Sequence, residues 1–556
     1  NIYMAEDKKG LYPIVLSPEK YARTIGREAM RSNIMAAVLV AEILKTSLGP
    51  RGMDKMLVDE LGDVDVTNDG ATILDRIHVE HPAAKLIIEI AKTQDKEVGD
   101  GTKRSTVLAG ELLKRADELL DKNIHPTVII EGYNKAAVIA EELVNKLAQK
   151  VSMDDEETLI KVAKSALSSK LASIYSDKLA KIIVDAVRKV TDVVELSDGE
   201  KKIIVDLDSL KIEKKIGGGV EETSLIDGIV IDKEKIHGEM PKVVSNAKIA
   251  LIGDAIEIKE TETDARINIS SPDQLEQFLS KEREMLKKMV EKIKEVGANA
   301  VFVQKGVDDL AAYYLAKYGI LAVRRVKKSD MEKIAKATGG KIINSIDELS
   351  ENDLGYAELV EERKVADENM IFITGCKNPK AVTILIRAGS EHVADEIERS
   401  INDAIKDVAT VIKYGKVIAG GGALEMELAE GIRKEAKKES SKVQMAMLAF
   451  ADALEAIPAA LAENAGMDTI EAMTQLRALH EQGKKWAGID AIEGKVRDMW
   501  DRNVIEPANI TIQAIKSAVE AAIMILKIDD VIAAVGKSTG GEGSSNKSGE
   551  EGEIEE

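Results

Sequence analysis

Hydrophobic residues recur at helical spacing through the N-terminal part of the chain. Runs of this kind cover 84–92 and 105–121, and apolar positions three or four residues apart place an apolar face along one side of a helix. Between 56 and 66 the pattern changes to short segments on either side of Gly62, which is typical of a β-hairpin. Helical spacing returns from 154 to about 190. These patterns predict a mostly helical first part with one hairpin.

The centre of the chain, from about 228 to 369, alternates short apolar runs with helical segments. Ser271-Pro272-Asp273-Gln274 is a capping box with proline at the first helical position, so we expect a helix that begins there and ends near Val296. This alternation predicts an α/β unit. From 423 to 532 the pattern is again mostly helical, and 536–556 has no apolar periodicity and is predicted to be disordered. The predicted strands of the centre include 249–252, 300–303, 320–323 and 370–373.

Composition limits the possible functions. The chain has 556 residues, enough for three or four domains at roughly 150 residues each. Its formal net charge of −20 would repel nucleic acid and anionic membranes. The single cysteine, Cys376, forms no intrachain disulfide, and we expect it to be a small buried hydrophobic residue of a protein in a reducing compartment. No apolar run approaches the ~20 residues that cross a bilayer, so we expect a cytoplasmic protein without a membrane partner.

The segment Gly99-Asp100-Gly101-Thr102 directly precedes the apolar helical run at 105–121. A helix start offers unpaired N–H groups and a positive dipole end, and glycines let a phosphate approach the backbone. A carboxylate at the same place can hold the Mg²⁺ that accompanies ATP. An ordinary helix N-cap is the alternative interpretation, which this motif alone does not exclude.

Two further segments can also be interpreted either as ordinary local structure or as part of a ligand site. Gly49-Pro50-Arg51-Gly52 follows an amphipathic stretch and is either a simple helix end or a loop close to a ligand. Asp69-Gly70 places a carboxylate in a tight turn between a predicted strand and a predicted helix.

Together, in this order and spacing, the three segments resemble the signature motifs of the group II chaperonins, the archaeal thermosome subunits and the related eukaryotic TRiC ring. The resemblance covers nearly the whole chain. It extends to the segments 62–70, 81–85, 125–127, 257–264, 324–330, 420–422 and 528–531.

The resemblance implies a multidomain α/β and α fold. A mostly helical equatorial ATPase domain is expected from both chain ends, a hinge-like intermediate domain from two segments, and an α/β apical domain with a helical protrusion from the centre. The polar stretch 257–264 is by itself either a solvated loop or a lid, and the resemblance favours a built-in lid near 254–286. The implied boundaries are 1–153 and 418–535 for the equatorial domain, 154–224 and 380–417 for the intermediate domain, 225–379 for the apical domain, and 536–556 for the tail.

The resemblance also implies the roles of individual residues. Asp403 is expected to activate the attacking water, Asp69 to stand near the γ-phosphate, and Asp100 to hold Mg²⁺. Lys170 is expected either to sense the γ-phosphate or to be an ordinary solvated lysine. The other residues expected at ATP are Leu48, Gly49, Pro50, Gly101, Thr102, Lys103, Arg104, Gly421, Gly422 and Glu506.

The implied function is that of an ATP-hydrolysing chaperone subunit in a double ring, homo- or hetero-oligomeric, that encloses unfolded or partly folded proteins. After Gly-Asp-Gly-Thr the family usually continues with hydroxyl residues, whereas Lys103 and Arg104 follow here. This departure leaves open an alternative, a passive nucleotide-binding ring or filament subunit with weak or no ATPase activity. Because two cations at a helix start oppose its dipole, we expect both side chains to face a polyanion such as a triphosphate. Side chains that point to solvent or to a neighbouring subunit are the other possibility.

Overall fold

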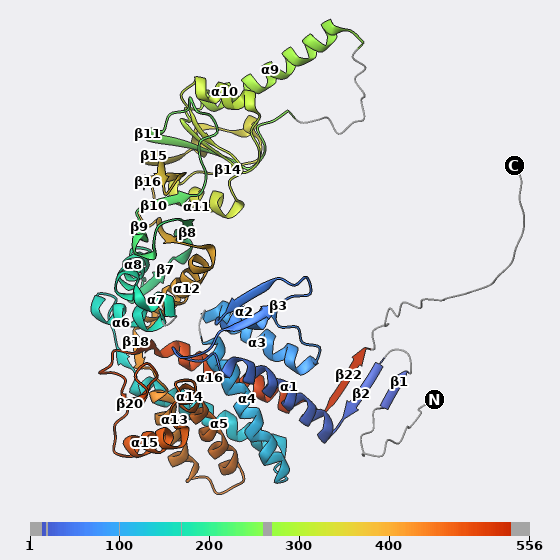
Figure 1. The fold of residues 1–556 in the computed structure, drawn as a ribbon, viewed down its shortest axis with the longest axis vertical. Helices are drawn as coiled ribbons and strands as arrows, with labels where there is room; N and C mark the ends of the chain where they lie inside the picture. The colour runs from blue at the N-terminus through green and yellow to red at the C-terminus, as the bar shows by residue number, and fades with distance from the viewer. Residues whose placement is uncertain (1–13, 18–20, 99–100, 168–169, 259–269, 535–556) are drawn as a thin grey trace, which may run out of the picture.

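The computed structural model describes residues 14–17, 21–98, 101–167, 170–258 and 270–534. Figure 1 shows an elongated molecule of three regions stacked along its long axis. We name them the base region (14–17, 21–150 and 416–534), the middle region (156–226 and 382–414) and the upper region (228–376). The predicted tail, 536–556, lies outside the described residues.

The base region has one apolar core to which both ends of the chain contribute. Helix α4 lies at its centre and packs on α1 from the N-terminal half and on α14 and α16 from the C-terminal half. Because neighbouring helices surround its first half, every residue of α4 from Ser105 to Leu113 is buried. The helices are α1 (Arg27–Lys45), α2 (Gly70–Arg76), α3 (Pro82–Val98), α4 (Thr102–Asp121), α5 (Pro126–Leu147), α13 (Ala423–Ala436), α14 (Val443–Asn464), α15 (Thr469–Glu481) and α16 (Ala508–Leu526).

Two of these helices correct the expectation that no apolar run is long enough to cross a membrane. Judged by length and composition alone, helices α14 and α16 could each cross a membrane. However, the most apolar 18-residue stretch of each helix is largely buried inside the base region. The buried share is 72% in α14 and 61% in α16. They are core helices, and their apolar character comes from packing against other helices.

The base region also contains short strands. The predicted hairpin is β3 (Lys55–Val58) and β4 (Val64–Thr67), with Gly62 at positive φ in the turn. It projects from the region in Figure 1, and its Met56 and Leu61 are 69% and 89% exposed. The largely helical prediction for 423–532 omitted several strands. The remaining strands are β1 (Ile14–Ser17), β2 (Tyr21–Ile25), β5 (Gln149–Lys150), β18 (Lys416–Ala419), β19 (Ala487–Asp490), β20 (Lys495–Asp498), β21 (Ile505–Pro507) and β22 (Asp530–Ala534).

The chain passes through the middle region twice, once on the way up and once on the way down. A three-stranded sheet in the order β8-β17-β9 joins the two passages, with β8 parallel to β17. Its apolar core is a separate cluster, to which Val417 of β18 and Ile505 of β21 in the base region also contribute. The elements are α6 (Glu156–Ala166), α7 (Lys170–Ile174), α8 (Ser176–Lys189), β6 (Thr191–Glu195), β7 (Lys201–Val205), β8 (Leu210–Ile216), β9 (Ser224–Ile226), β17 (Val382–Ala388) and α12 (Glu391–Tyr414).

The upper region is an α/β unit with one mixed sheet in the order β10-β16-β15-β11-β12-β13, and β14 pairs with β11. The four predicted strands all lie in this sheet, and each is fully buried in the predicted stretch because apolar cores cover both sheet faces. The elements are β10 (Gly228–Ile231), β11 (Val243–Ile252), α9 (Pro272–Glu295), β12 (Ala300–Val303), α10 (Asp309–Lys317), β13 (Leu321–Val323), α11 (Lys328–Thr338), β14 (Ile342–Ile343), β15 (Gly355–Val365) and β16 (Glu368–Cys376).

Cys376, at the end of β16, is only partly buried. Its Sγ donates to the carbonyl of Ile373 at 3.5 Å. Burial raises the pKa of the thiol to about 11, so it is a poor nucleophile at neutral pH.

Helix α9 begins where the capping box predicts. The N–H of Gln274 donates to Ser271 Oγ at 3.3 Å, and the Gln274 side chain accepts from the N–H of Ser270 at 3.1 Å, one residue earlier than the usual capping box. Only the second half of the helix packs on the region, through Leu286, Val290 and Ile293. The first half projects from the body in Figure 1. Of the predicted lid segment, residues 259–269 lie outside the described residues.

Candidate functional site

The start of α4 has the features of an anion-binding helix end. Its N-cap, Gly101, has φ 82° and provides no side-chain cap. A Cβ on Gly101 would lie 3.3 Å from Ile510 Cγ2 and 3.4 Å from Ala514 Cβ, so α16 packs closely behind it. The next side chain, Thr102, is 6% exposed, and its Oγ1 has no hydrogen-bond partner among the described residues. A buried hydroxyl without a partner among the described residues, at the positive end of a helix, suits a phosphate. Asp100 lies outside the described residues.

The loop after α1 lies against α14. Asn464 on α14 donates through its side-chain amide to the carbonyls of Lys45 and Leu48, at 3.0 and 2.9 Å. Gly49 has φ 78°, and a Cβ there would lie 2.4 Å from Leu461 Cδ2. Only glycine fits both the backbone conformation and the space, so the sequence Leu48-Gly49-Pro50 fixes where this loop runs.

The turn at Asp69 lies next to the start of α4. Asp69 caps α2, and its Oδ2 accepts from the N–H and the hydroxyl of Thr72 at 2.8 and 2.5 Å. Lys103, one residue into α4, donates to the carbonyl of Ser47 at 3.0 Å and to Asn68 Oδ1. The ammonium group therefore links the loop after α1 to the turn before α2, and the three segments form one surface.

The C-terminal half of the chain supplies the glycine run Gly420-Gly421-Gly422. Gly422, at φ 78°, is the N-cap of α13, and a Cβ there would lie 2.6 Å from Pro458 Cβ on α14. Gly421 accepts from the N–H of Ile489 on β19 at 2.7 Å. The run therefore lies between α14, to which the loop at Gly49 is also bound, and the β19–β20 hairpin.

Arg104 joins the start of α4 to this C-terminal half. Its guanidinium donates to Glu506 Oε2 at 2.9 Å and to Thr511 Oγ1 at 3.0 Å, and forms an ion pair with Glu425 Oε1 at 3.2 Å. Burial raises the pKa of the Glu425 carboxyl, Arg104 opposes this, and Glu506 adds to it. The sequence-based expectation that Arg104 faces a polyanion or solvent is therefore corrected, because two carboxylates of the same chain neutralise it.

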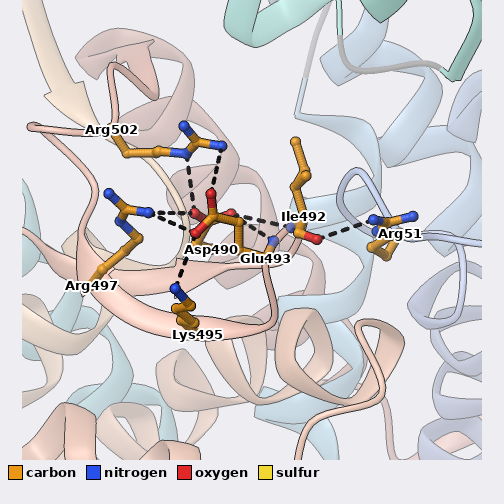
Figure 2. Close-up of polar contacts among 7 residues, drawn as sticks. All are labelled: Arg51, Asp490, Ile492, Glu493, Lys495, Arg497 and Arg502. Carbon is orange, nitrogen blue, oxygen red and sulfur yellow. Dashed lines mark hydrogen bonds and ion pairs between the residues drawn. The ribbon is translucent and has the colours of Figure 1, made fainter.

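A second charged cluster was not predicted. Figure 2 shows Asp490 and Glu493, in the β19–β20 turn, surrounded by Arg497, Arg502 and Lys495. Asp490 Oδ1 accepts from the N–H of Ile492 and of Glu493 at 3.2 and 3.3 Å, and its Oδ2 accepts from Arg502 at 3.1 Å.

The same turn contacts the loop after α1. Arg51 donates to the carbonyl of Ile492 at 3.0 Å. These two residues are 441 positions apart in the chain, and no local pattern connects them. The only sequence signal was the Asp-x-x-x-Gly spacing of a tight turn.

Two other expected site residues lie in the middle region. Asp403 is half-buried on α12, a helix that packs on β21 and α16 of the base region. On the same helix, burial raises the pKa of the Glu396 carboxyl, and Asp54 of the base region adds to the shift. The α12 surface that carries Glu396 therefore lies within electrostatic range of the loop after α1. Lys170 begins α7, but its side chain is not among those described.

The polar groups at the start of α4 fit a nucleoside triphosphate with Mg²⁺. Among the described residues, no group of three or more His, Cys, Asp or Glu side chains could form a metal cage. Mg²⁺ that arrives with a nucleotide needs only one or two carboxylates in addition to phosphate oxygens and water. The buried hydroxyl of Thr102, the positive end of the α4 dipole and the close glycine packing are consistent with such a ligand.

Comparison with known proteins decides the family. A model of the TCP-1/cpn60 chaperonin family matches residues 40–535. This chain belongs to that family. The thermosome subunit of Pyrococcus horikoshii is 60% identical to this chain over 522 residues, which is 94% of each protein. The thermosome subunit alpha of Archaeoglobus fulgidus is 58% identical over 535 residues, which is 96% of this chain and 97% of the relative. The solved open state monomer of a group II chaperonin from Methanococcoides burtonii is similar with a TM-score of 0.61 and 45% identity, covering 78% of this chain and all of that one.

The predicted family and fold class are thereby confirmed. The protein is a group II chaperonin subunit of multidomain α/β and α architecture, an ATP-dependent chaperone and an ATPase. The passive holdase, left open by Lys103 and Arg104, is not the function that this family membership supports.

Proposed function

We propose that this chaperonin hydrolyses ATP at the start of α4, and that hydrolysis drives the enclosure of unfolded or partly folded proteins. The observation that carries this assignment is the convergence of segments from both chain halves on one helix start, where the buried hydroxyl of Thr102 has no partner among the described residues. N–H groups at such an end stabilise phosphate oxygens electrostatically.

Each residue set has a defined task in this proposal. The loop Leu48-Gly49-Pro50 and the segment Gly101–Lys103 line the phosphates, with Lys103 as a fixed cation and Asp69 near the γ-phosphate. Asp100 is the proposed ligand of Mg²⁺, which supplies charge neutralisation at the phosphate oxygens. Gly421, Gly422 and Glu506 line the nucleoside side, and Lys170 is the proposed sensor of the γ-phosphate.

Asp403 is the proposed group that orients and deprotonates the attacking water. It lies on α12, which belongs to the middle region but packs on β21 and α16. A carboxylate on a separate region reaches the site only when that region closes on the base, so hydrolysis is coupled to domain closure. The proximity of Glu396 on α12 to Asp54 supports this approach.

The domain division follows the apolar cores. One core unites residues from 30 to 144 with residues from 418 to 526, a second belongs to the two middle segments, and further cores fill the sheet unit. This distribution supports the equatorial, intermediate and apical domains with the boundaries given above.

The projecting half of α9 is the proposed lid. Leu275 and Leu279 are 45% and 43% exposed there, and an apolar surface that does not pack on its own region is available for neighbouring lids. Deletion of 257–279 should leave ATP hydrolysis and assembly largely intact but abolish enclosure. The measurement is protease protection of the apical domain with a transition-state nucleotide analogue, and equal protection of the deletion variant and the parent would contradict this role.

Assembly into a double ring of like subunits is part of the proposal. The exposed β3–β4 hairpin, with Met56 and Leu61 at its surface, is suited to pair with the terminal strands of a neighbouring subunit. Homo- and hetero-oligomeric rings are equally compatible with this hairpin. We propose a cytoplasmic location, since the two long apolar helices are core helices.

The central experiment is Asp403→Ala in the assembled protein. We expect ATP to bind with little loss and phosphate release to slow by at least ~100-fold, the order for removal of a positioned general base. Asp100→Ala should instead weaken binding of the magnesium–nucleotide complex. Asp407→Ala, one turn further along α12, is the matched control for loss of a carboxylate from the same helix. Parental turnover by Asp403→Ala would show that the assignment is wrong.

A further inference from the structure

Arg104 forms a bridge between the two halves of the chain at the proposed nucleotide site. It leaves the first turn of α4 and contacts Glu425 on α13, Glu506 on β21 and Thr511 on α16. Its side chain is 17% exposed, so the pairs are largely shielded from solvent. Because three separate elements fix its guanidinium, Arg104 has little freedom to turn toward another ligand.

The two carboxylates that Arg104 contacts differ in exposure. The side chain of Glu425 is 4% exposed, whereas that of Glu506 is 26% exposed. Glu425 approaches Nε at 3.2 Å without the geometry of a hydrogen bond, and its Oε1 has no hydrogen-bond partner among the described residues. Glu425 is thus a buried counter-charge, while Glu506 is partly exposed.

The two oxygens of Glu506 point in different directions. Oε2 accepts from Arg104 at 2.9 Å. Oε1 lies on the other side, where a Cβ on Gly420 would be only 2.6 Å away. The absence of a side chain at Gly420 therefore leaves room for Oε1 directly beside the glycine run that we assign to the nucleoside side.

A charge-assisted bond from a planar guanidinium fixes the orientation of a carboxylate more strictly than solvent or an ammonium group does. Without the guanidinium, Glu506 would be repelled by Glu425 and would be free to rotate. The presence of arginine at this position thus orients Glu506 as well as neutralising it.

We propose that Arg104 is a positioning residue, which fixes Glu506 Oε2 so that Oε1 accepts a hydrogen bond from a sugar hydroxyl of a bound nucleoside di- or triphosphate. This inference rests on the nucleotide site proposed above. It assigns to Arg104 a role on the sugar side of the ligand, away from the phosphates, and distinguishes it from Lys103, which contacts the two phosphate loops.

The test compares binding of ADP with binding of 2′,3′-dideoxy-ADP, both with Mg²⁺, to the assembled protein by isothermal titration. The parent should prefer ADP by about tenfold or more, the effect of one hydrogen bond to a charged group. Arg104→Thr should bind ADP no better than dideoxy-ADP, with the affinity for dideoxy-ADP unchanged. Arg104→Lys keeps the charge but not the planar fork, and its preference should fall to a value between those of the parent and of Arg104→Thr.

Two further variants keep the test decisive. Arg104→Thr leaves Glu425 buried without a counter-ion, so the same change is also made with Glu425→Gln, which keeps the cluster neutral and should show the same loss of preference. Arg27→Thr, which removes an exposed pair with Asp121, is the matched control and should keep the parental preference.

The possible results separate this inference from the proposed site. Equal binding of both ligands by the parent, or an undiminished preference in both Arg104→Thr variants, would overturn the positioning role while leaving the nucleotide site intact. A parent that binds neither ligand would overturn both.

Discussion

The base region and the joint between the middle and upper regions connect distant parts of the chain by different forces. In the base, α4 packs on α1, α14 and α16 through apolar side chains that are almost fully buried. In the joint, β8 of the middle region reaches the upper region mainly through lysines. We call Lys211, Lys215, Lys333 and Lys336, with the groups they contact, the lysine joint.

The lysine joint consists of ion pairs and hydrogen bonds. Lys211, 5% exposed, contacts Asp330 at 3.0 Å on α11 and donates to the carbonyl of Val230 at 2.6 Å. Lys215, 7% exposed, contacts Asp232 at 2.9 Å and also Glu368.

Two lysines on α11 complete the joint from the opposite side. Lys336 contacts Asp206 of the middle region at 2.8 Å, and Lys333 donates to the carbonyl of Asp208 at 2.9 Å. The upper region therefore contacts the middle region through these charged groups and through one small apolar cluster, in which Leu385 of β17 packs with Val230, Met370 and Phe372.

The difference between the two connections suits a machine that moves one region on another. Close apolar packing has one well-defined arrangement and loses contact energy at any displacement. Partly exposed ion pairs between long side chains, such as Lys336 with Asp206, can exchange partners or be replaced by water at low net cost. We therefore expect the base to remain rigid while the lysine joint allows the upper region to reorient.

The largest effect should come from the apolar core of the base. Phe450 is fully buried and packs edge-on against Tyr133, with ring centroids 5.8 Å apart. Phe450→Ala should destabilise the base by about 3–5 kcal/mol. The readout is denaturation followed by tryptophan fluorescence, because the two tryptophans of the chain, Trp486 and Trp500, stack in the base. Phe278→Ala, on the projecting half of α9, is the control that should leave the transition unchanged.

The second-largest effect should weaken the lysine joint without affecting the core of the base. Lys211→Met leaves Asp330 and Glu213 without their shared cation and should destabilise the joint by about 3 kcal/mol, as for breaking a buried pair. Amide exchange in β8 and β17 should accelerate, while the tryptophan transition of the base should not move. Adding Asp330→Asn should restore part of the protection. A shifted tryptophan transition in Lys211→Met would contradict the separation.

The third prediction concerns Glu425, a buried carboxylate of α13 next to the start of α4, whose pKa is raised by burial. In the folded protein its pKa lies above 4.5, the ordinary value of a glutamate side chain. The folded protein therefore favours the protonated carboxyl, and the stability that this provides is fully present below pH 4.5. It is lost as the pH rises through the pKa of the folded protein, at no more than ~1.4 kcal/mol per pH unit. Glu425→Gln should remove this loss, so that its stability relative to the parent increases from pH 4 to 7. The exposed Glu481→Gln is the control, and parallel pH profiles for parent and Glu425→Gln would contradict the expectation.

The smallest effect is expected at the exposed ion pair of the lysine joint, Lys336 with Asp206. Lys336 and Asp206 are 42% and 31% exposed, so Lys336→Met should cost less than ~1 kcal/mol. In 1 M salt, where the screening length is about 3 Å, this cost should disappear while that of Lys211→Met persists. Amide exchange of α11 at low and high salt measures both, and an equal salt response of the two variants would show that burial does not distinguish them.

The local structure followed from the sequence because its causes lie within a few residues. Helical spacing identified α4 and the packed half of α9, and the capping box at Ser271 identified where α9 begins. The buried strands of the upper region were recognised as short, continuous apolar runs, and Gly62 marked the turn of the β3–β4 hairpin. The apolar helices α14 and α16 were underestimated, because a core helix and a membrane helix differ in their surroundings more than in their sequence.

The candidate site was only partly predictable. The glycines at 49, 101 and 422 pointed to close approaches that the structure contains, at Leu461, Ile510 and Pro458. The resemblance to a family supplied the candidate residues of the C-terminal half, which no spacing within the sequence connects to α4. Arg104 was assigned to phosphate because helix-dipole reasoning considered only its own helix, and its actual partners lie in other elements.

The sequence by itself determined the family, the secondary-structure elements and the glycines that shape the loops, since all of these depend on motifs or on interactions within about one helical turn. The tertiary structure decided which charges meet. Arg104 pairs with Glu506, 402 residues away, and Arg51 donates to Ile492, 441 residues away. These contacts exist only because the two chain ends share one apolar core, and burial of that core depends on the packing of whole helices and not on any local pattern.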